Sequence, residues 1–217
     1  MKKVLTLVSA LLLSSSLTAN AGELGIGVTG AAHYFSADGT ETTRTTLQRN
    51  NGSHDEVVVV PEIFIETIDE SGFTLGLSYI PTRDVGSKSR SDVNADLGQD
   101  NGTYTAKAEL ENVIQLYTDI PSGALGSYPI HTKIGLQHVT LATLESLNSG
   151  SAYPNKDLLG LTVGLGTKGD LPYGNNLYYK GEVTYTKFQT YEETSNGNKV
   201  KADMDDAAAK FSIGYKF

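Results

Sequence analysis

Hydrophobic and polar residues alternate with a period of two along most of the chain after residue 21. This alternation predicts β-strands, because successive side chains of a strand point to opposite faces. No segment has the spacing of a convincing amphipathic helix. We expect eight strands, at about residues 23–35, 56–67, 73–79, 103–118, 130–138, 159–166, 177–185 and 207–217.

The connections between these segments alternate in length. Long polar stretches at about 36–55, 82–102, 143–157 and 193–205 take turns with shorter ones at 69–72, 119–129 and 168–176. Bacterial outer-membrane barrels have this asymmetry, with short periplasmic turns and longer external loops. An even strand number also returns the C-terminus to the end where the N-terminus entered. The pattern predicts an all-β fold, an eight-stranded antiparallel up-and-down transmembrane β-barrel.

The first 21 residues have the features of a secretory signal peptide. Lys2 and Lys3 precede an apolar run at 4–13, and Ala19-Asn20-Ala21 forms a small-residue cleavage site. An N-terminal membrane anchor is the disfavoured alternative, because a spanning helix needs about 20 apolar residues. We therefore expect cleavage after Ala21 and a barrel domain at 22–217.

Composition excludes several classes of protein. The chain has no cysteine, which rules out a disulfide scaffold, a thiol redox enzyme and a zinc-thiolate site. The formal net charge of −8 becomes −10 once the two signal lysines are removed. Because the remaining basic residues are scattered, we expect no binding to nucleic acid. After the signal no apolar run is long enough for a membrane helix, so any membrane crossing must use strands.

One face of the predicted strands is polar or small and suits the lumen of a narrow barrel. Eight strands enclose a space that side chains can fill. The inward set contains equal numbers of acids and bases, and their pairing would form a salt-bridged plug. These residues are Glu62, Glu66, Lys107, Glu109, Glu111, Lys133, Lys180, Glu182, Lys210 and Lys216. A proton path or a small selective pore is the alternative, which the interleaved signs disfavour.

Aromatic residues on the opposite face mark two girdles. Phe73, Tyr179, Tyr215 and Phe217 fall near one interface, and Tyr34, Tyr79 and Tyr104 near the other. A soluble periplasmic barrel that binds a ligand would show the same alternation with its faces inverted. The aromatic placement and the terminal phenylalanine favour the membrane version.

The closing segment Lys210-Phe211-Ser212-Ile213-Gly214-Tyr215-Lys216-Phe217 resembles the terminal assembly signature of outer-membrane barrels. With the signal peptide and the loop asymmetry, the chain resembles the small eight-stranded family that includes OmpX and the transmembrane part of OmpA. The resemblance implies that Phe211, Ile213, Tyr215 and Phe217 form a signal read by the barrel-assembly machinery. We also expect contact with outer-membrane lipid and lipopolysaccharide, and a monomer.

Three positions disturb the strand pattern. Pro61 lies inside a strand although it has no N–H for the ladder, and Asn112 falls on the lipid face between Leu110 and Ile114. Alternation also breaks near His138, which a β-bulge in that strand would explain. At Pro61 and Asn112, either a bulge shifts the register or the strand boundaries differ.

Other motifs are weak. Two G-x-G-x-x-G matches, at 25–30 and 164–169, lack the following helix that nucleotide binding needs. The calcium-like start at 92–96, with Asp100, has Leu97 and Thr103 where a calcium loop needs Gly and Glu. The four histidines, His33, His54, His131 and His138, have no serine and acid at a recognisable spacing. We expect no metal, no cofactor and no enzyme, with hydrolysis by a lipid-modifying barrel as the alternative.

The sequence does not specify the cellular task. We expect a structural or surface-interaction role through the long loops. The alternatives are a minor pore for small solutes and the soluble ligand-binding barrel.

Overall fold

A computed structural model describes residues 22–42, 47, 49–92, 102–146, 153–172, 176–195 and 197–217. The predicted signal peptide and most of the calcium-like segment, residues 93–101, lie outside this described part. A search of the described residues for a helix long and apolar enough to cross a membrane found none. The strands are β1 (Glu23–Thr42), β2 (Arg49–Ile68), β3 (Thr74–Ile80), β4 (Arg83–Asp92), β5 (Gly102–Leu125), β6 (Tyr128–Ser146), β7 (Lys156–Asp170), β8 (Leu177–Phe188), β9 (Tyr191–Ser195) and β10 (Asn198–Lys216).

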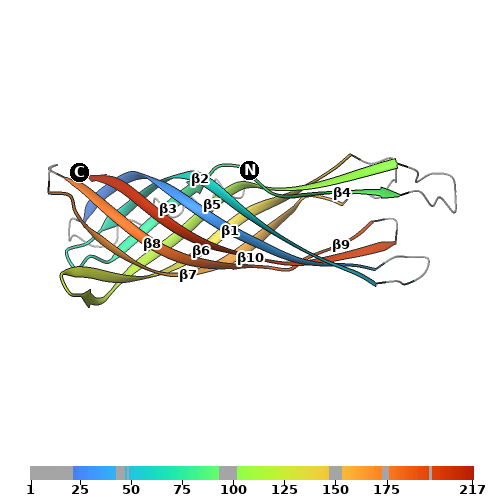
Figure 1. Ribbon diagram of the computed structural model, residues 1–217. Helices are drawn as coiled ribbons and strands as arrows, with labels where there is room; N and C mark the ends of the chain where they lie inside the picture. The colour runs from blue at the N-terminus through green and yellow to red at the C-terminus, as the bar shows by residue number, and fades with distance from the viewer. Residues whose placement is uncertain are drawn as a thin grey trace.

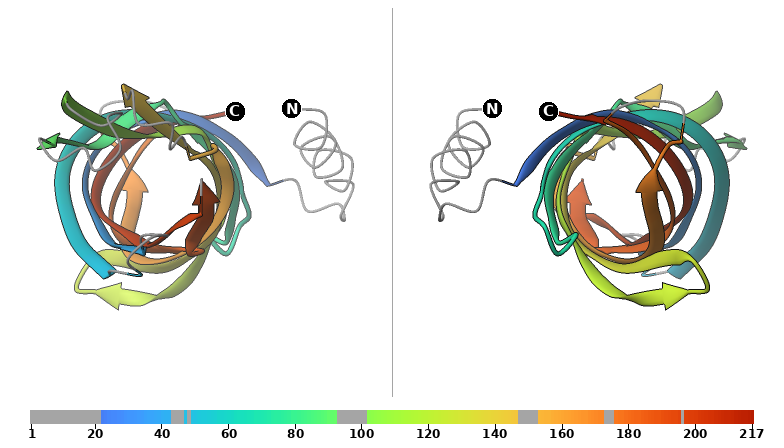
Figure 2. Two further views of the ribbon diagram at one scale, coloured as in Figure 1. Left: turned by 90° about the vertical axis from the view of Figure 1, so that its right-hand side faces the viewer. Right: turned by 90° about the vertical axis from the view of Figure 1, so that its left-hand side faces the viewer.

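The strands form one antiparallel sheet that closes on itself. Neighbours follow the order β1-β2-β3-β5-β6-β7-β8-β10, and β1 pairs with β10 to complete an eight-membered ring (Figure 1). β4 continues the position of β3 along β5, and β9 continues that of β8 along β10. Seen along its axis, the ring encloses a narrow interior (Figure 2). The predicted eight-stranded antiparallel barrel is confirmed.

The strands are longer than the sequence pattern predicted. β1 and β2 pair as far as Thr42 and Arg49, well into a stretch that we expected to be loop. Four hairpins extend this way to one side of the barrel, which we call the hairpin end (Figure 1). Glu23 and Phe217 lie at the other side, the terminal end. Outward positions toward the hairpin end are polar, and backbone pairing continues there beyond the expected strand ends.

A belt of exposed apolar side chains surrounds the half of the barrel near the terminal end. On β1 these outward residues lie between Leu24 and Tyr34, and on β2 between Val57 and Ile65. A tilted strand needs about 9–11 residues to cross the hydrocarbon core, which matches these lengths. Beyond Tyr34 and Val57 the outward positions of both strands change to Ser36, Asp38 and Asp55.

The polarity of the interior changes in the opposite direction along the barrel axis. Inside the belt, the buried residues are mostly charged, hydroxylated or small. Toward the hairpin end, they become an apolar cluster, which we call the apolar plug: Phe35, Val60, Ile80, Val85, Leu110, Val113, Val139, Leu141, Leu158, Phe188, Tyr191 and Met204. The barrel is therefore polar inside and apolar outside in one half, and apolar inside and polar outside in the other.

The three irregular positions have different explanations. Asn112 has a left-handed backbone (φ 52°) at a register shift between β5 and β6, so the bulge alternative holds there. Pro61 faces outward with no register shift against Gly30 of β1. On its other side, the β2–β3 ladder ends at Ile63–Tyr79, short of Pro61.

The predicted bulge at His138 is wrong. β6 alternates without interruption through Gln137, His138 and Val139, and the bulge lies on its partner β5. The inward residue changes there from polar Gln137 to apolar Val139 because the strand enters the apolar plug.

Candidate functional site: a buried charge network

Glycines on several strands make room for the large side chains of the polar interior. A Cβ at Gly76 would lie 2.3 Å from the ring of Tyr117, and one at Gly214 would lie 2.4 Å from the ring of Tyr178. Gly27 leaves similar room for Phe64. Each of these glycines is the direct cross-strand partner of the aromatic residue that it accommodates, so a large side chain from the neighbouring strand lies over bare backbone and leaves little void.

Lys180 of β8 lies at the centre of the first group of charges. Its Nζ is 2.8 Å from Glu66 Oε2 of β2 and 2.8 Å from Asp119 Oδ2 of β5. The hydroxyl groups of Tyr117 and Tyr178 donate to the two oxygens of Glu66, at 2.5 and 2.9 Å. One buried ammonium therefore joins three separate walls of the barrel.

Lys133 of β6 extends this group toward β8. Its Nζ lies 3.0 Å from Asp119 Oδ1 and 2.9 Å from Glu182 Oε1, and 3.5 Å from the centre of the Tyr117 ring. His131 Nε2 is 3.0 Å from the same Glu182 oxygen. We call the set of Glu66, Asp119, His131, Lys133, Lys180 and Glu182 the Lys180 cluster. Its three acids face two lysines and one histidine.

A second group, the His33 cluster, lies between the Lys180 cluster and the apolar plug. It consists of His33, Glu62, Arg83, Asp206 and Lys210. Lys210 Nζ is 2.8 Å from Glu62 Oε1, and Arg83 Nη2 is 3.2 Å from Asp206 Oδ2. The His33 ring lies between the two acids, with Nδ1 2.7 Å from Asp206 and Nε2 3.1 Å from Glu62.

Ion pairs so deeply buried must offset a large desolvation cost. All the members of both clusters have buried side chains. Each charge has at least one opposite partner within about 3 Å, and several have two. Removal of one member of such a set leaves an uncompensated charge, which is far costlier than replacement of a complete pair.

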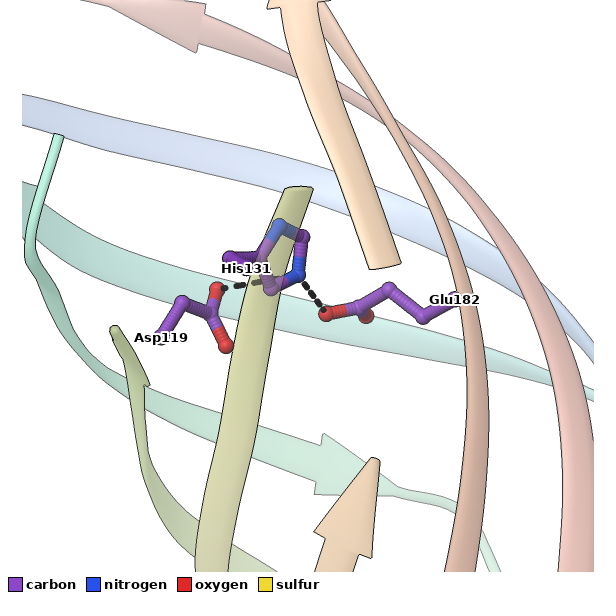
Figure 3. Close-up of side chains that lie close together, drawn as sticks. All are labelled: Asp119, His131 and Glu182. Atoms are coloured by element: carbon purple, nitrogen blue, oxygen red, sulfur yellow. Dashed lines mark hydrogen bonds and ion pairs between the residues drawn. The ribbon is translucent and has the colours of Figure 1, made fainter. Parts of the chain in front are cut away.

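Three residues of the Lys180 cluster have the geometry of metal ligands. Ligand atoms of Asp119, His131 and Glu182 lie within 4.8 Å of one another, and Figure 3 shows the His131 ring between the two carboxylates. However, the ammonium groups of Lys133 and Lys180 already contact these carboxylates at 2.8–3.0 Å. A metal ion would have to displace both lysines, so the residues present fit a salt-bridge network better than a metal site.

Only some of the residues expected in the lumen lie there. Glu62, Glu66, Lys133, Lys180, Glu182 and Lys210 are buried and belong to the two clusters. Lys216 pairs with Glu23 and Asp170 at the rim of the terminal end, outside both clusters.

The inward orientation expected for Lys107, Glu109 and Glu111 is wrong. The bulge at Asn112 inserts an extra residue, so that Leu110 faces the interior and its neighbours Glu109 and Glu111 turn outward. Lys107 Nζ is 2.7 Å from Asp84 Oδ1 and 2.7 Å from Glu109 Oε1. Its side chain is 36% exposed, in contrast to 2% for Lys180.

Sequence reasoning missed several members of the clusters. Asp119 and Arg83 had been placed in connections, and Asp206 lay just beyond the expected start of its strand. His33 and His131 were considered only for catalysis. The alternation along their strands places both histidines on the inner face, where carboxylates of other strands also lie, and this was the available signal.

Side chains fill much of the interior in the described residues. A cavity between the two clusters has room for about one water molecule and is lined by residues such as Glu62, Lys133, Lys180 and Gln115. Above the His33 cluster, the apolar plug fills the ring with packed side chains.

Comparisons with known proteins give similarity only at the level of solved structures. No family model matches the chain, and no curated protein sequence matches it. The chain is similar to the outer membrane protein AlkL in DMPC lipid bilayers, with 11% identity, 92% of each chain covered and a TM-score of 0.49. It is also similar to the outer membrane protease OmpT from Escherichia coli, with 9% identity, 93% of this chain and 99% of that chain covered, and a TM-score of 0.45.

Neisserial surface protein A is a third similar structure, with 10% identity, 87% of this chain and 97% of that chain covered, and a TM-score of 0.36. Because all three identities are near one residue in ten and all three TM-scores are below 0.5, the fold assignment rests on the strand pairing of this chain itself.

Proposed function

We propose that this protein is an integral barrel of the bacterial outer membrane with a plugged lumen, and that it serves a structural or surface-interaction role through its hairpin end. The observation that carries this proposal is the belt of exposed apolar side chains around a buried, charged interior. Side chains such as Val59, Leu161 and Val183 are 77%, 59% and 60% exposed.

Exposure of this surface to water would be energetically unfavourable. A contiguous apolar belt is far larger than the patches that soluble monomers expose. In a soluble barrel the same alternation would place these residues inside and the lysines and glutamates outside, but the structure has the opposite arrangement. A closed sheet is also one of the two architectures that satisfy all backbone groups within hydrocarbon.

The filled interior supports a plug rather than a pore. Charges of both signs pair across the lumen, and no ring of like charge lines a passage in the described residues. The apolar plug then closes the path toward the hairpin end. Protons and small ions would have to cross this apolar layer as well as the two clusters.

The hairpin end supports a role in surface contacts. Its strands continue past the apolar belt with polar outward residues, supported inside by the apolar plug. In an outer membrane this half would stand among or above the lipopolysaccharide, where it could contact lipid, matrix or host molecules. The clusters and the apolar plug would act as a rigid base for these hairpins.

We also propose that the closing strand carries the assembly signal. Phe211, Ile213 and Tyr215 point outward from β10, Phe217 directly follows this strand, and all four are 40–70% exposed. They therefore form one apolar edge that an assembly factor could bind before β1 pairs with β10. The main chain of Phe217 then donates to Leu24 O at 2.9 Å in the closed barrel.

The experiment that tests membrane insertion is fractionation of cells combined with electrophoresis of unheated and boiled samples. The proposal predicts that the protein sediments with outer membranes and changes mobility on boiling. Recovery of the processed protein from the periplasm without detergent would contradict it.

The plug is tested separately, by conductance measurements with the purified barrel in planar bilayers. We expect no stable single-channel steps in neutral buffer. Large, long-lived conductance steps from correctly folded protein would refute the plug while leaving the membrane barrel intact.

A further inference from the structure

The hairpin that joins β5 to β6 at the terminal end has an unusual surface. Its residues 120–130 read Ile-Pro-Ser-Gly-Ala-Leu-Gly-Ser-Tyr-Pro-Ile, with no charged side chain. Positions 120–129 are all exposed, including Leu125 (73%) and Tyr128 (58%). We call this segment the apolar hairpin.

The other two connections at the same end are different. The β2–β3 turn contains Asp69 and Glu70. There Ser71 donates its hydroxyl hydrogen bond to Asp69, which lowers the pKa of that carboxyl below its ordinary value. The β7–β8 connection, residues 171–176, also has no charged residue, but it directly follows Asp170, whose side chain is 75% exposed and pairs with Lys216. Of the three connections, the apolar hairpin has the longest stretch without a charge.

The apolar hairpin also bends away from the barrel wall. Figure 2 shows it lying outside the ring, to one side of the barrel axis. A register shift between Pro121 and Gly123 marks a bulge, and Gly123 has a φ of +122°. Bulges bend a strand pair and increase its twist. At the tip, Gly126 (φ +62°) provides the positive φ that a two-residue hairpin turn requires.

The bend is continuous with the apolar belt. The outward side of β5 leads from Leu116 to Ile120, and that of β6 from Ile134 to Ile130. Between these two sides, the hydroxyl groups of Ser122 and Thr132 form a 2.7 Å hydrogen bond with each other. The apolar hairpin thus extends the lipid-facing surface sideways at the barrel end.

We propose that the apolar hairpin is an interfacial anchor that inserts into the lipid leaflet at the terminal end of the barrel. The inference rests on the proposed membrane barrel and adds a contact to it. A segment exposed on both faces suits lipid, which can surround it, whereas a protein partner would cover one face. Aromatic and apolar side chains without charge are those that partition into a membrane interface.

The absence of tryptophan from the chain allows a direct test. Leu125→Trp and Tyr128→Trp each introduce a single fluorophore at the tip of the apolar hairpin. Glu70→Trp, in the charged β2–β3 turn, is the matched control at the same end. Each variant is reconstituted in phosphatidylcholine vesicles, with or without brominated acyl chains, and its heat-dependent gel mobility is checked first.

The proposal predicts blue-shifted emission from both hairpin variants. They should lose a larger fraction of their emission in brominated lipid than the control does, and a smaller fraction with iodide added to the water. The anchor proposal would be overturned if the hairpin variants emitted like the control, with quenching by iodide and no change in brominated lipid. A blue shift that grows with protein density and is not accompanied by quenching from brominated lipid would indicate that a second copy of the protein, rather than lipid, covers the apolar hairpin.

The gel keeps this result separate from the proposed function. A variant that shows the heat-dependent mobility change but has a water-exposed tryptophan refutes the anchor alone. Failure of the wild-type protein to enter vesicles in a heat-modifiable form refutes the membrane barrel.

Discussion

At the scale of single residues, Lys180 shows how a lysine can stabilise the inside of a narrow barrel. Its ammonium lies within 2.8 Å of two carboxylates from different strands, and aromatic rings of Phe64 and Tyr117 lie within 5.3 Å. The same residue type at position 216 lies at the rim, where it pairs with side chains that are 54% and 75% exposed. Position, rather than residue type, decides the energetic consequence of the charge.

This contrast predicts different costs for the same substitution. Lys180→Met should lower the free energy of unfolding by about 3–5 kcal/mol, because Glu66 and Asp119 lose their shared cation in a buried site. Lys216→Met should cost about 1 kcal/mol or less, as expected for solvent-screened pairs. Urea unfolding of the barrel in lipid vesicles measures both. Equal, small effects would mean that the Lys180 cluster does not stabilise the fold.

At the scale of elements, one bulge changes which residues of β5 face the lumen. Before Asn112, Leu110 points inward, and after it Val113, Gln115 and Tyr117 do. The shift falls where the interior passes from the apolar plug to the polar half. It keeps apolar residues inside the plug and puts charged Glu109 and Glu111 on the outer surface.

The backbone of Asn112 provides a prediction at this scale. Its φ of 52° is accessible to glycine and asparagine but disfavoured for a β-branched residue. Asn112→Gly should leave stability nearly unchanged, whereas Asn112→Val should cost about 1–2 kcal/mol. The unfolding midpoints of the two variants, measured in parallel, test this. A Val variant as stable as the Gly variant would place the bulge elsewhere on the strand.

At the scale of the whole molecule, the barrel consists of two halves of opposite polarity. In the half near Glu23 and Phe217, the outer face is apolar, and the interior is polar. In the half near the hairpin tips, the outer face is polar, and the interior is apolar. The proposed membrane barrel accounts for this inversion, because the first half would face hydrocarbon and the second would face water.

Arginine substitutions test the boundary between the halves. Leu77→Arg and Val163→Arg place a charge on the outward face of the apolar belt and should each cost about 2–4 kcal/mol if they lie near the bilayer midplane. Ser53→Arg, outward in the hairpin half, should change stability by no more than about 0.5 kcal/mol. Folding yield and unfolding in vesicles provide the readouts. Wild-type behaviour of both belt variants would contradict the assigned facing.

The order of the strands and much of their facing could be predicted before the structure was known. Alternation in segments such as 23–35 and 207–217 depends only on neighbouring residues, so it reveals a strand and its two faces locally. The same information failed at Lys107, Glu109 and Glu111, because a single inserted residue reverses every side chain beyond it. Nothing in the composition of that strand marks Asn112 as the point of insertion.

The sequence by itself determined that the chain folds into strands in which apolar and polar residues alternate. It also determined that the sheet has one apolar and one polar face, and that the two ends of the chain lie at the same end of a barrel. Only the tertiary structure decided that Lys180 meets Glu66 and Asp119, that His33 lies between Glu62 and Asp206, and that an apolar plug follows the charges. Alternation is a property of neighbours along one strand. Which inward groups meet depends on how eight strands are staggered when the sheet closes, and that arrangement joins residues more than a hundred positions apart.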